Sequence, residues 1–304
     1  MLFRSGDRLH CYLTTQTPQL ARDTIAAQLR LSADAIRVIA GPDVGGGFGP
    51  KDGWYPEDIV TAWVAFRTGK VTRWHETRSE SMLGLYHGRA QVQTLRLGGD
   101  REGHLHAYEM EIVQDAGAYP SLGAWLPDLT MMMAPGTYDI PMVRASSRSV
   151  VTNSTPVNAY RGAGRPEATA AIERMIDEYA RRVGLDPIEV RRRNLIAPFA
   201  APRANSMGTI YDSGDYRGAL DLLTRHVEVA ALRAEQTRRR LSGDPIQLGI
   251  GVSTYVEVTG AEEAITLVRE RMAAMQAKLD DALAAGPPED GLDAAPSPAE
   301  PENG

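Results

Sequence analysis

The spacing of apolar residues at the start of the chain predicts a strand, a helix and a second strand. Residues 9–14 form a strand-like run. A helix is expected next, because Thr17 can cap it, Pro18 suits the first helical position, and apolar residues recur at every fourth position up to Leu29. Residues 35–40 then alternate as a half-buried strand does.

The middle of the chain carries another helix and several strand-like runs. The helix is expected from Pro56 to Gly69, which has no Cβ and suits a helix end, and a strand is expected at residues 71–75. Two extended segments within residues 91–114 flank a glycine-rich turn and predict a hairpin. Residues 143–152 predict a further strand.

The clearest helical pattern begins at Pro166 and ends at Gly184. A shorter helix is expected from Pro187 to Arg193. Strands and helices interleave without a strict strand–helix–strand rhythm, which favours an α+β or mixed α/β fold. The apolar residues on one face of the long helix are Ile172, Met175, Ile176, Tyr179 and Val183.

The last part of the chain differs in composition from the rest. Residues 261–285 predict a charged, alanine-rich helix. Residues 286–304 are acidic and rich in proline and alanine, and no lysine or arginine follows Lys278. Such a segment cannot bury enough apolar surface to fold, so a disordered acidic tail is expected.

Composition narrows the classes of function. The 304 residues include 33 Lys and Arg and 39 Asp and Glu, and no basic block indicates a nucleic acid or an anionic membrane as partner. No apolar stretch approaches the roughly 18 residues of a membrane span, and the first residues lack a signal-peptide core, so a cytoplasmic protein is expected. A single cysteine, Cys11, excludes an internal disulfide, a cysteine-ligated iron–sulfur cluster and a structural zinc site within the sequence.

A glycine cluster directly follows the second predicted strand. In Gly45-Gly46-Gly47-Phe48-Gly49, backbone without Cβ atoms lets N–H groups approach an anion or an oxo ligand closely. The cluster is not a phosphate-binding loop, because no Gly-Lys-Ser/Thr ending is present and Pro50 would break an immediately following helix. Its glycine spacing also differs from that of a dinucleotide-binding loop. The remaining alternative is a tight turn that binds nothing.

A second candidate is the segment Arg161-Gly162-Ala163-Gly164-Arg165, which leads into the long helix. A helix N-terminus has partial positive charge and unpaired N–H groups, so arginines and glycines there suit an anionic ligand. The alternative is an ordinary connecting loop with its arginines in solvent. Gln16, in Thr15-Gln16-Thr17-Pro18, could point its amide at a ligand or could only support the turn between strand and helix.

These segments occur in the order typical of one enzyme family. A Thr-Thr-Gln segment is followed about thirty residues later by Gly-Gly-Gly-Phe-Gly-Pro-Lys, and much later by Ala-Tyr-Arg-Gly-Ala-Gly-Arg-Pro. Over residues 9–260 the chain resembles the molybdopterin-binding large subunit of the xanthine dehydrogenase, aldehyde oxidase and aerobic carbon monoxide dehydrogenase family. Further matching stretches are residues 76–78, 115–119, 185–194 and 211–214.

The resemblance implies a molybdenum–pterin cofactor, in bacterial members often a cytosine dinucleotide. Gln16 would lie near an oxo ligand of molybdenum, while Phe48 and Gly49 would offer backbone N–H groups to the apical oxygen. Arg161 would lie in the substrate pocket and stabilise negative charge that develops on a substrate carbonyl or ring. The other implied cofactor-binding residues are Gly46, Gly47, Gly162, Ala163 and Gly164.

The arginine segment also separates branches of the family. Carbon monoxide oxidisers with a copper–molybdenum centre carry a cysteine there, whereas Gly162, Ala163 and Gly164 follow Arg161 here. The segment resembles the second form, for which aldehydes and N-heterocycles are candidate substrates alongside carbon monoxide. Asp52 lies where some purine-oxidising members have a substrate-binding glutamate, and a surface role is the favoured interpretation for it.

The resemblance covers only the first half of the family's molybdenum-binding region. Residues 1–260 would form an N-terminally incomplete first molybdopterin-binding domain. The family's Gln-Gly-Gln-Gly loop and the glutamate that acts as general base belong to the other half, and neither Gln-Gly-Gln-Gly nor Gly-Glu occurs in this sequence.

The family also implies partners. An iron–sulfur small subunit and an FAD-containing medium subunit would receive the electrons, and a further chain could carry the missing half of the large subunit. The region alone would then be inactive. The alternative hypothesis is a catalytically inactive remnant, or an interaction protein that retains the fold.

Overall fold

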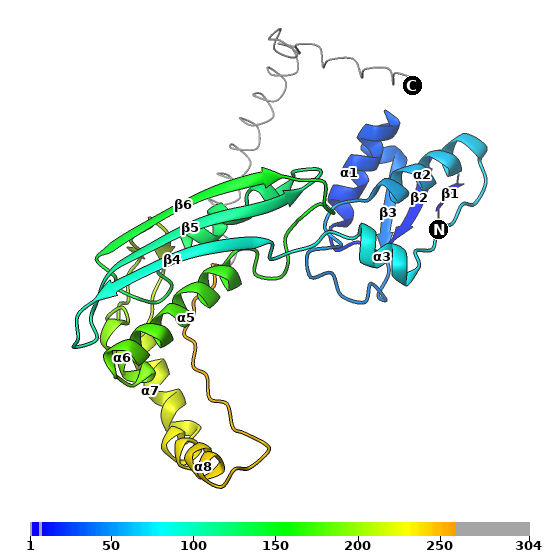
Figure 1. Cartoon of the computed structure of the whole chain (residues 1–304). Helices are drawn as coiled ribbons and strands as arrows, with labels where there is room; N and C mark the ends of the chain where they lie inside the picture. The colour runs from blue at the N-terminus through cyan, green and yellow to red at the C-terminus, as the bar shows by residue number, and fades with distance from the viewer. Residues whose placement is uncertain (1, 6–7, 259–304) are drawn as a thin grey trace, which may run out of the picture. The chain divides into compact units, whose positions relative to one another are not determined.

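The first part of the chain forms a three-stranded sheet with two helices packed on one face (Figure 1). The computed structural model describes residues 2–5 and 8–258. β1 runs antiparallel to β2, whereas β3 runs parallel to β2 because a helix, α1, carries the chain back between them. The bounds are β1 (Leu2–Ser5), β2 (Arg8–Leu13), α1 (Pro18–Leu29), η1 (Ala33–Ala35), β3 (Ile36–Ala40) and α2 (Pro56–Thr68).

Alternate side chains of β2 form the core of this layer. Leu9 and Cys11 are buried, and Ile25 of α1 and Ala62 of α2 belong to the same apolar cluster. Burial raises the pKa of the Cys11 thiol to about 12, because the thiolate would lose its hydration. α2 ends as predicted, at Gly69 in the left-handed conformation (φ 65°).

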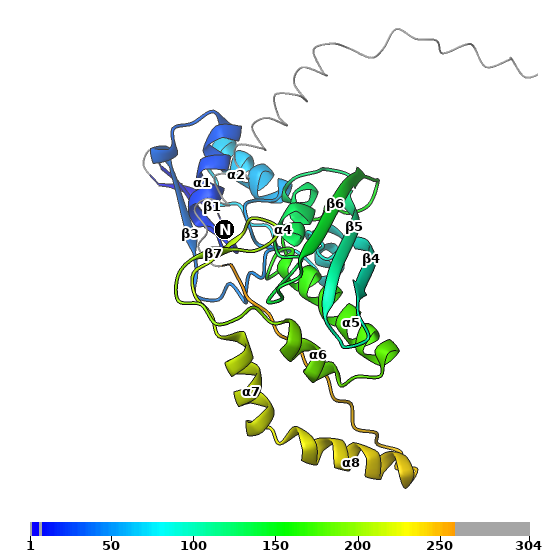
Figure 2. The same cartoon turned by 90° about the vertical axis from the view of Figure 1, so that its left-hand side faces the viewer.

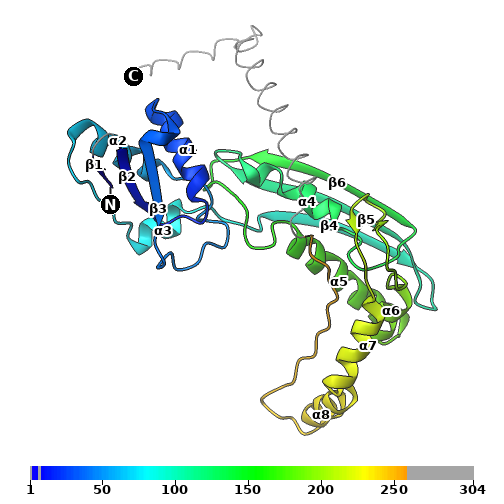
Figure 3. The same ribbon diagram turned by 180° about the vertical axis from the view of Figure 1, so that it is seen from behind.

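The second layer is a sheet of three long strands with α5 packed on it (Figures 1 and 3). β4 and β5 form the predicted hairpin, and β6 pairs in parallel with the other edge of β5. The chain passes through two short helices between β5 and β6. The bounds are β4 (Gln91–Gly99), β5 (Leu105–Gly117), η2 (Leu122–Ala124), α4 (Leu126–Met132), β6 (Met142–Val151) and α5 (Arg165–Val183).

The helix α5 is the long amphipathic helix that the sequence predicts. Its residues Ile172 and Ile176 are buried in the same cluster as Met110 of β5. On the next helix, α6 (Pro187–Asn194), Arg191 is completely buried and pairs with Glu173 of α5 (2.7 Å). A buried guanidinium and a buried carboxylate each need the other, so this pair fixes α6 against α5.

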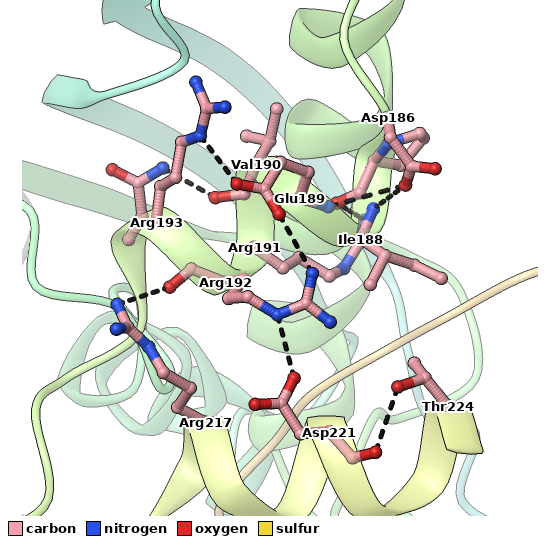
Figure 4. A network of polar contacts seen from close by, with 12 residues as sticks. Asp186, Ile188, Glu189, Val190, Arg191, Arg192, Arg193, Arg217, Asp221 and Thr224 are labelled. Atoms are coloured by element: carbon pink, nitrogen blue, oxygen red, sulfur yellow. Dashed lines mark hydrogen bonds and ion pairs between the residues drawn. The ribbon is translucent and has the colours of Figure 1, made fainter. Parts of the chain in front are cut away.

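Side chains also fix α6 at its two ends (Figure 4). Asp186 caps its N-terminus by accepting a hydrogen bond from the Ile188 N–H (2.7 Å). Arg192 joins α6 to α7 (Tyr216–His226) through an ion pair with Asp221 (2.8 Å). Arg217 of α7 donates to the Arg192 carbonyl (2.8 Å).

After α8 (Val229–Leu241), the chain returns past α6 towards α5 (Figure 2). There the Thr254 hydroxyl is hydrogen-bonded to the Tyr138 hydroxyl (2.8 Å), and Glu257 pairs with Arg165 (2.8 Å). The contact with Arg165 fastens the end of the described chain to the first residue of α5, and the contact with Tyr138 fastens it to the segment before β6. The remaining elements are α3 (Arg78–Gly84), β7 (Arg203–Ala204) and β8 (Ile210–Tyr211).

Two predictions of local structure are wrong. The strand expected at residues 71–75 does not form; within it only Thr72 makes a bridge, and Val71 and Trp74 are exposed. A strand-like segment becomes a strand only when another strand lies beside it. Thr17 stands at the cap position of α1, but its hydroxyl does not cap the helix, because it accepts a hydrogen bond from the Gly53 N–H (2.7 Å) instead.

The mixture of helices and sheets confirms the α+β class. Residues Met1–Glu257 form one compact unit. The helix expected at 261–285 and the tail expected at 286–304 lie outside the described residues. Within the part of the chain that is described, no helix is both long and apolar enough to span a bilayer.

Candidate functional site

The segment after β2 is hydrogen-bonded to the residues that follow the glycine cluster. The Gln16 N–H donates to the Lys51 carbonyl (2.9 Å), and the Thr15 hydroxyl donates to the same oxygen (3.2 Å). Together with the Thr17 contact to Gly53, these bonds hold residues 15–17 beside residues 51–53. Residues 51–53 directly follow Pro50 and residues 44–49, which we call the glycine loop.

Gln16 reaches over the glycine loop with its side chain. Its Oε1 accepts a hydrogen bond from the Gly49 N–H (3.0 Å). A Cβ on Gly47 would overlap the Gln16 amide, so a glycine at this position leaves the space that Gln16 occupies. The neighbouring Phe48 N–H has no hydrogen-bond partner among residues 2–5 and 8–258. Of the two backbone donors expected from the sequence, one is thus bonded to Gln16 and the other is open.

Residues 159–164, which we call the arginine loop, lie directly against the glycine loop. The Arg161 N–H donates to the Phe48 carbonyl (2.9 Å), and the Phe48 and Tyr160 rings are stacked with centroids 6.5 Å apart. Gly49 has φ 109°, and a Cβ there would overlap the Ala159 carbonyl. The two loops therefore meet through backbone atoms, at a distance that only glycine permits.

The end of the arginine loop is already occupied by a carboxylate. Glu167 in the first turn of α5 accepts a hydrogen bond from the Gly164 N–H (3.0 Å). Arg165 donates to the Ala163 carbonyl (3.1 Å) and pairs with Glu257. The sequence suggested that this helix N-terminus would receive an anionic ligand, but here Glu167 takes one of its N–H groups and Arg165 is held in an ion pair.

The two loops and Gln16 surround a surface depression of about 390 Å³. All the site residues expected from the sequence line this depression except Gly164. Gly164 packs against α4 instead, where an added Cβ would overlap the Thr130 backbone nitrogen. The lining residues are Gln16, Gly46, Gly47, Phe48, Gly49, Ala159, Tyr160, Arg161, Gly162 and Ala163.

The depression has fixed positive charge at its rim. The Arg161 side chain is exposed, and among the described residues no hydrogen bond or ion pair involves its guanidinium. A guanidinium remains protonated at physiological pH, and it can donate several hydrogen bonds to an oxygen-rich group. In the described part of the chain, His, Cys, Asp and Glu side chains do not gather in a group of three that could hold a metal ion.

One residue of the site has no signal in the sequence. Arg89 lies just before β4, and it pairs with Glu167 (2.8 Å) and donates to the Arg161 carbonyl (2.5 Å). A lone arginine between two loops is indistinguishable in sequence from a surface arginine, so only the fold reveals these contacts.

The residues present fit an anionic, oxygen-bearing cofactor. The fit rests on the cradle without Cβ atoms, the open Phe48 N–H and the unpaired Arg161 guanidinium. Gln16 can contribute amide N–H donors as well, because its Oε1 is the atom engaged by Gly49.

Comparison with known proteins gives consistent matches. Residues 2–195 match the family model of the molybdopterin cofactor-binding domain. The nicotine 6-hydroxylase large subunit of Paenarthrobacter nicotinovorans is 32% identical over 258 residues, which cover 84% of this chain and 31% of that protein. The carbon monoxide dehydrogenase large chain of Hydrogenophaga pseudoflava is 33% identical, over 84% of this chain and 32% of that one.

Comparison with solved structures also matches this chain to part of a larger oxidoreductase chain. Quinoline 2-oxidoreductase from Pseudomonas putida 86 superposes with a TM-score of 0.72 and 34% sequence identity, over 78% of this chain and 30% of that one. The chain therefore spans about a third of the length of the relatives that it matches.

Proposed function

Because the chain belongs to the molybdopterin-binding large-subunit family of molybdenum hydroxylases, we propose that the depression between its two loops binds a molybdenum–pterin cofactor. The observation that carries the proposal is the meeting of the glycine loop and the arginine loop around one depression, where the Phe48 N–H and the Arg161 guanidinium have no partner among the described residues. We further propose the cytosine dinucleotide form of the cofactor, on the family resemblance alone.

Each residue of the depression has a distinct task in this proposal. The Phe48 N–H would donate to an oxygen of the cofactor, and Gln16, whose Oε1 accepts from the Gly49 N–H, would offer its amide N–H groups to the cofactor as well. Arg161 also lines the depression, and its charge would stabilise an oxyanion on the substrate. Gly46, Gly47, Gly162 and Ala163 form the surface on which the cofactor rests.

The bound cofactor would supply two-electron oxidation in which a water-derived oxygen enters an aldehyde, an N-heterocycle or carbon monoxide. The described residues contribute binding, orientation and electrostatic stabilisation to that reaction. They include no matched general base, so we propose that the base, like the Gln-Gly-Gln-Gly loop, belongs to the remainder of the large subunit.

The complete enzyme in this proposal has further parts. An iron–sulfur subunit and an FAD subunit accept the electrons, and residues 1–260 act as the first molybdopterin-binding domain. The names of the relatives, a "large subunit", a "large chain" and a "subunit gamma" of a dehydrogenase complex, support a multi-subunit enzyme.

The test is cofactor content. The full chain is expressed alone and together with the polypeptides that carry the missing large-subunit half and the electron-accepting subunits, and bound molybdenum and pterin are measured. We expect pterin in the co-expressed preparation. A preparation without molybdenum and pterin in either case contradicts the proposal and favours the alternative, a non-catalytic protein that retains the fold.

Two glycine variants sharpen this test. Gly47→Ala places a Cβ where the Gln16 amide lies, so we expect pterin content to fall several-fold. Gly98→Ala, in β4, is the matched control, because a Cβ there meets no atom within 4 Å. Equal pterin content in the two variants would show that the space at Gly47 plays no part in binding.

A further inference from the structure

One guanidinium outside the two loops ties the arginine loop to the helix that follows it. Arg89 Nη1 donates to Glu167 Oε2 (2.8 Å), and Nη2 donates to the Arg161 carbonyl (2.5 Å). The Arg89 Cζ also lies 5.0 Å from the centroid of the Tyr160 ring. A single side chain thus contacts the helix N-terminus, the backbone of the loop and an aromatic ring of the loop.

The acceptor of this ion pair is itself bonded to the arginine loop. Glu167 is only 7% exposed, and the same Oε2 that accepts from Arg89 also accepts from the Gly164 N–H (3.0 Å). A carboxylate so deeply buried requires a charged partner, and Arg89 supplies that partner among the described residues. Loss of Arg89 would therefore disturb the arginine loop at two positions, Arg161 and Gly164.

Backbone strain is concentrated at the same place. Among the residues that the structure describes, five non-glycine residues have positive φ, and three of them are Phe48 (56°), Arg89 (62°) and Ala163 (41°). Residues other than glycine rarely adopt a positive φ. It persists where surrounding contacts determine the backbone, and such places are frequently functional sites.

We propose that Arg89 is a positioning residue that holds the arginine loop in the conformation in which Arg161 lies at the rim of the depression. The planar guanidinium is required because it bridges two acceptors at once, whereas a lysine ammonium is a single point charge. The consequence for cofactor binding rests on the proposed function, but the effect on the loop is a property of this chain alone.

The loop is tested first, without any cofactor. Hydrogen–deuterium exchange is measured on the full chain for wild type, Arg89→Ala and Arg89→Lys. We expect the amides of Arg161, Ala163 and Gly164 to exchange roughly ten-fold faster in Arg89→Ala, because hydrogen bonds to a charged group are lost. Arg89→Lys is expected to lie between the two.

The matched control is Arg192→Ala on α6. Arg192 is 33% exposed and Arg89 is 34% exposed, and each makes an ion pair of 2.8 Å. We expect Arg192→Ala to leave exchange in residues 159–164 at the wild-type rate. Faster exchange throughout the chain in Arg89→Ala would indicate a general stabilising role and overturn the inference, as would wild-type exchange in the loop.

Cofactor content is the second readout. In the co-expressed preparation, we expect pterin content to fall several-fold in Arg89→Ala and to recover in part in Arg89→Lys. If the wild type lacks pterin, the proposed function fails while the exchange result still decides the role of Arg89. If Arg89→Ala does not fold, Arg89→Lys takes its place, and wild-type exchange in that variant overturns the inference.

Discussion

Replacing Gly49 with alanine is expected to push the two loops apart. An alanine at φ 109° is strained by about 1–3 kcal/mol. The new Cβ would also overlap the Ala159 carbonyl, so the loops must separate and the hydrogen bond from the Arg161 N–H to the Phe48 carbonyl is lost. That bond contributes about 0.5–1.5 kcal/mol. Together these effects should lower the free energy of unfolding by about 1.5–4.5 kcal/mol.

Gly69→Ala separates the strain from the steric overlap. Gly69 also has positive φ (65°), but a Cβ there meets no atom within 4 Å. This control variant should therefore lose only the preference of glycine for the left-handed conformation, about 1–2 kcal/mol. The difference between the two variants measures the close approach of the loops.

The assay is urea unfolding of the full chain followed by far-ultraviolet circular dichroism, with hydrogen exchange of residues 159–164 measured in parallel. We expect Gly49→Ala to have the lower urea midpoint and faster exchange in the arginine loop, while Gly69→Ala keeps the wild-type exchange there. The reasoning is refuted if the two variants have equal midpoints and exchange in the loop does not change.

Further predictions concern the buried ion pair of Arg191 with Glu173 and the buried thiol of Cys11. Arg191→Met leaves Glu173 buried without its charged partner and should destabilise the chain by about 3–5 kcal/mol in urea unfolding; Arg181→Ala, which removes an exposed ion pair on α5, should have no measurable effect. Because burial raises the pKa of Cys11 from 9.0 to about 12, the thiol remains protonated in the folded chain, and iodoacetamide at pH 9 should modify it far more slowly than in urea. The raised pKa also means that the Cys11 thiol stabilises the fold fully below pH 9 and that this contribution is lost as the pH rises towards 12. Cys11→Ala should therefore make the free energy of unfolding less dependent on pH at the alkaline end. A pH dependence unchanged from that of the wild type would contradict this.

The elements that the sequence predicts well are those whose signals are local. Helical periodicity and a terminal glycine are sufficient to predict α2 and α5. A glycine-rich turn between two extended runs is sufficient to predict the β4–β5 hairpin. Residues 71–75 have a strand-like composition too, but pairing depends on a neighbour that no local pattern encodes. The prediction fails there for that reason.

The candidate site also has features that local sequence signals predict and features that they do not. The glycine cluster, the arginine segment and Gln16 could be named from the sequence, and the fold brings them to one depression. Three features could not be predicted: the bond from Gly49 to Gln16, the occupation of the helix N-terminus by Glu167, and the contacts of Arg89. Each joins segments that only the tertiary structure brings together.

Different groups hold the two loops together and supply the exposed charge at the depression. Glycines and backbone hydrogen bonds hold the loops together, as at Gly49 and between Arg161 and Phe48, and the Arg161 side chain takes no part in these bonds. Loops that already have their bound conformation lose little conformational entropy when a ligand binds. Because the loops do not depend on the Arg161 guanidinium, a substitution at Arg161 should remove its charge while the depression keeps its form.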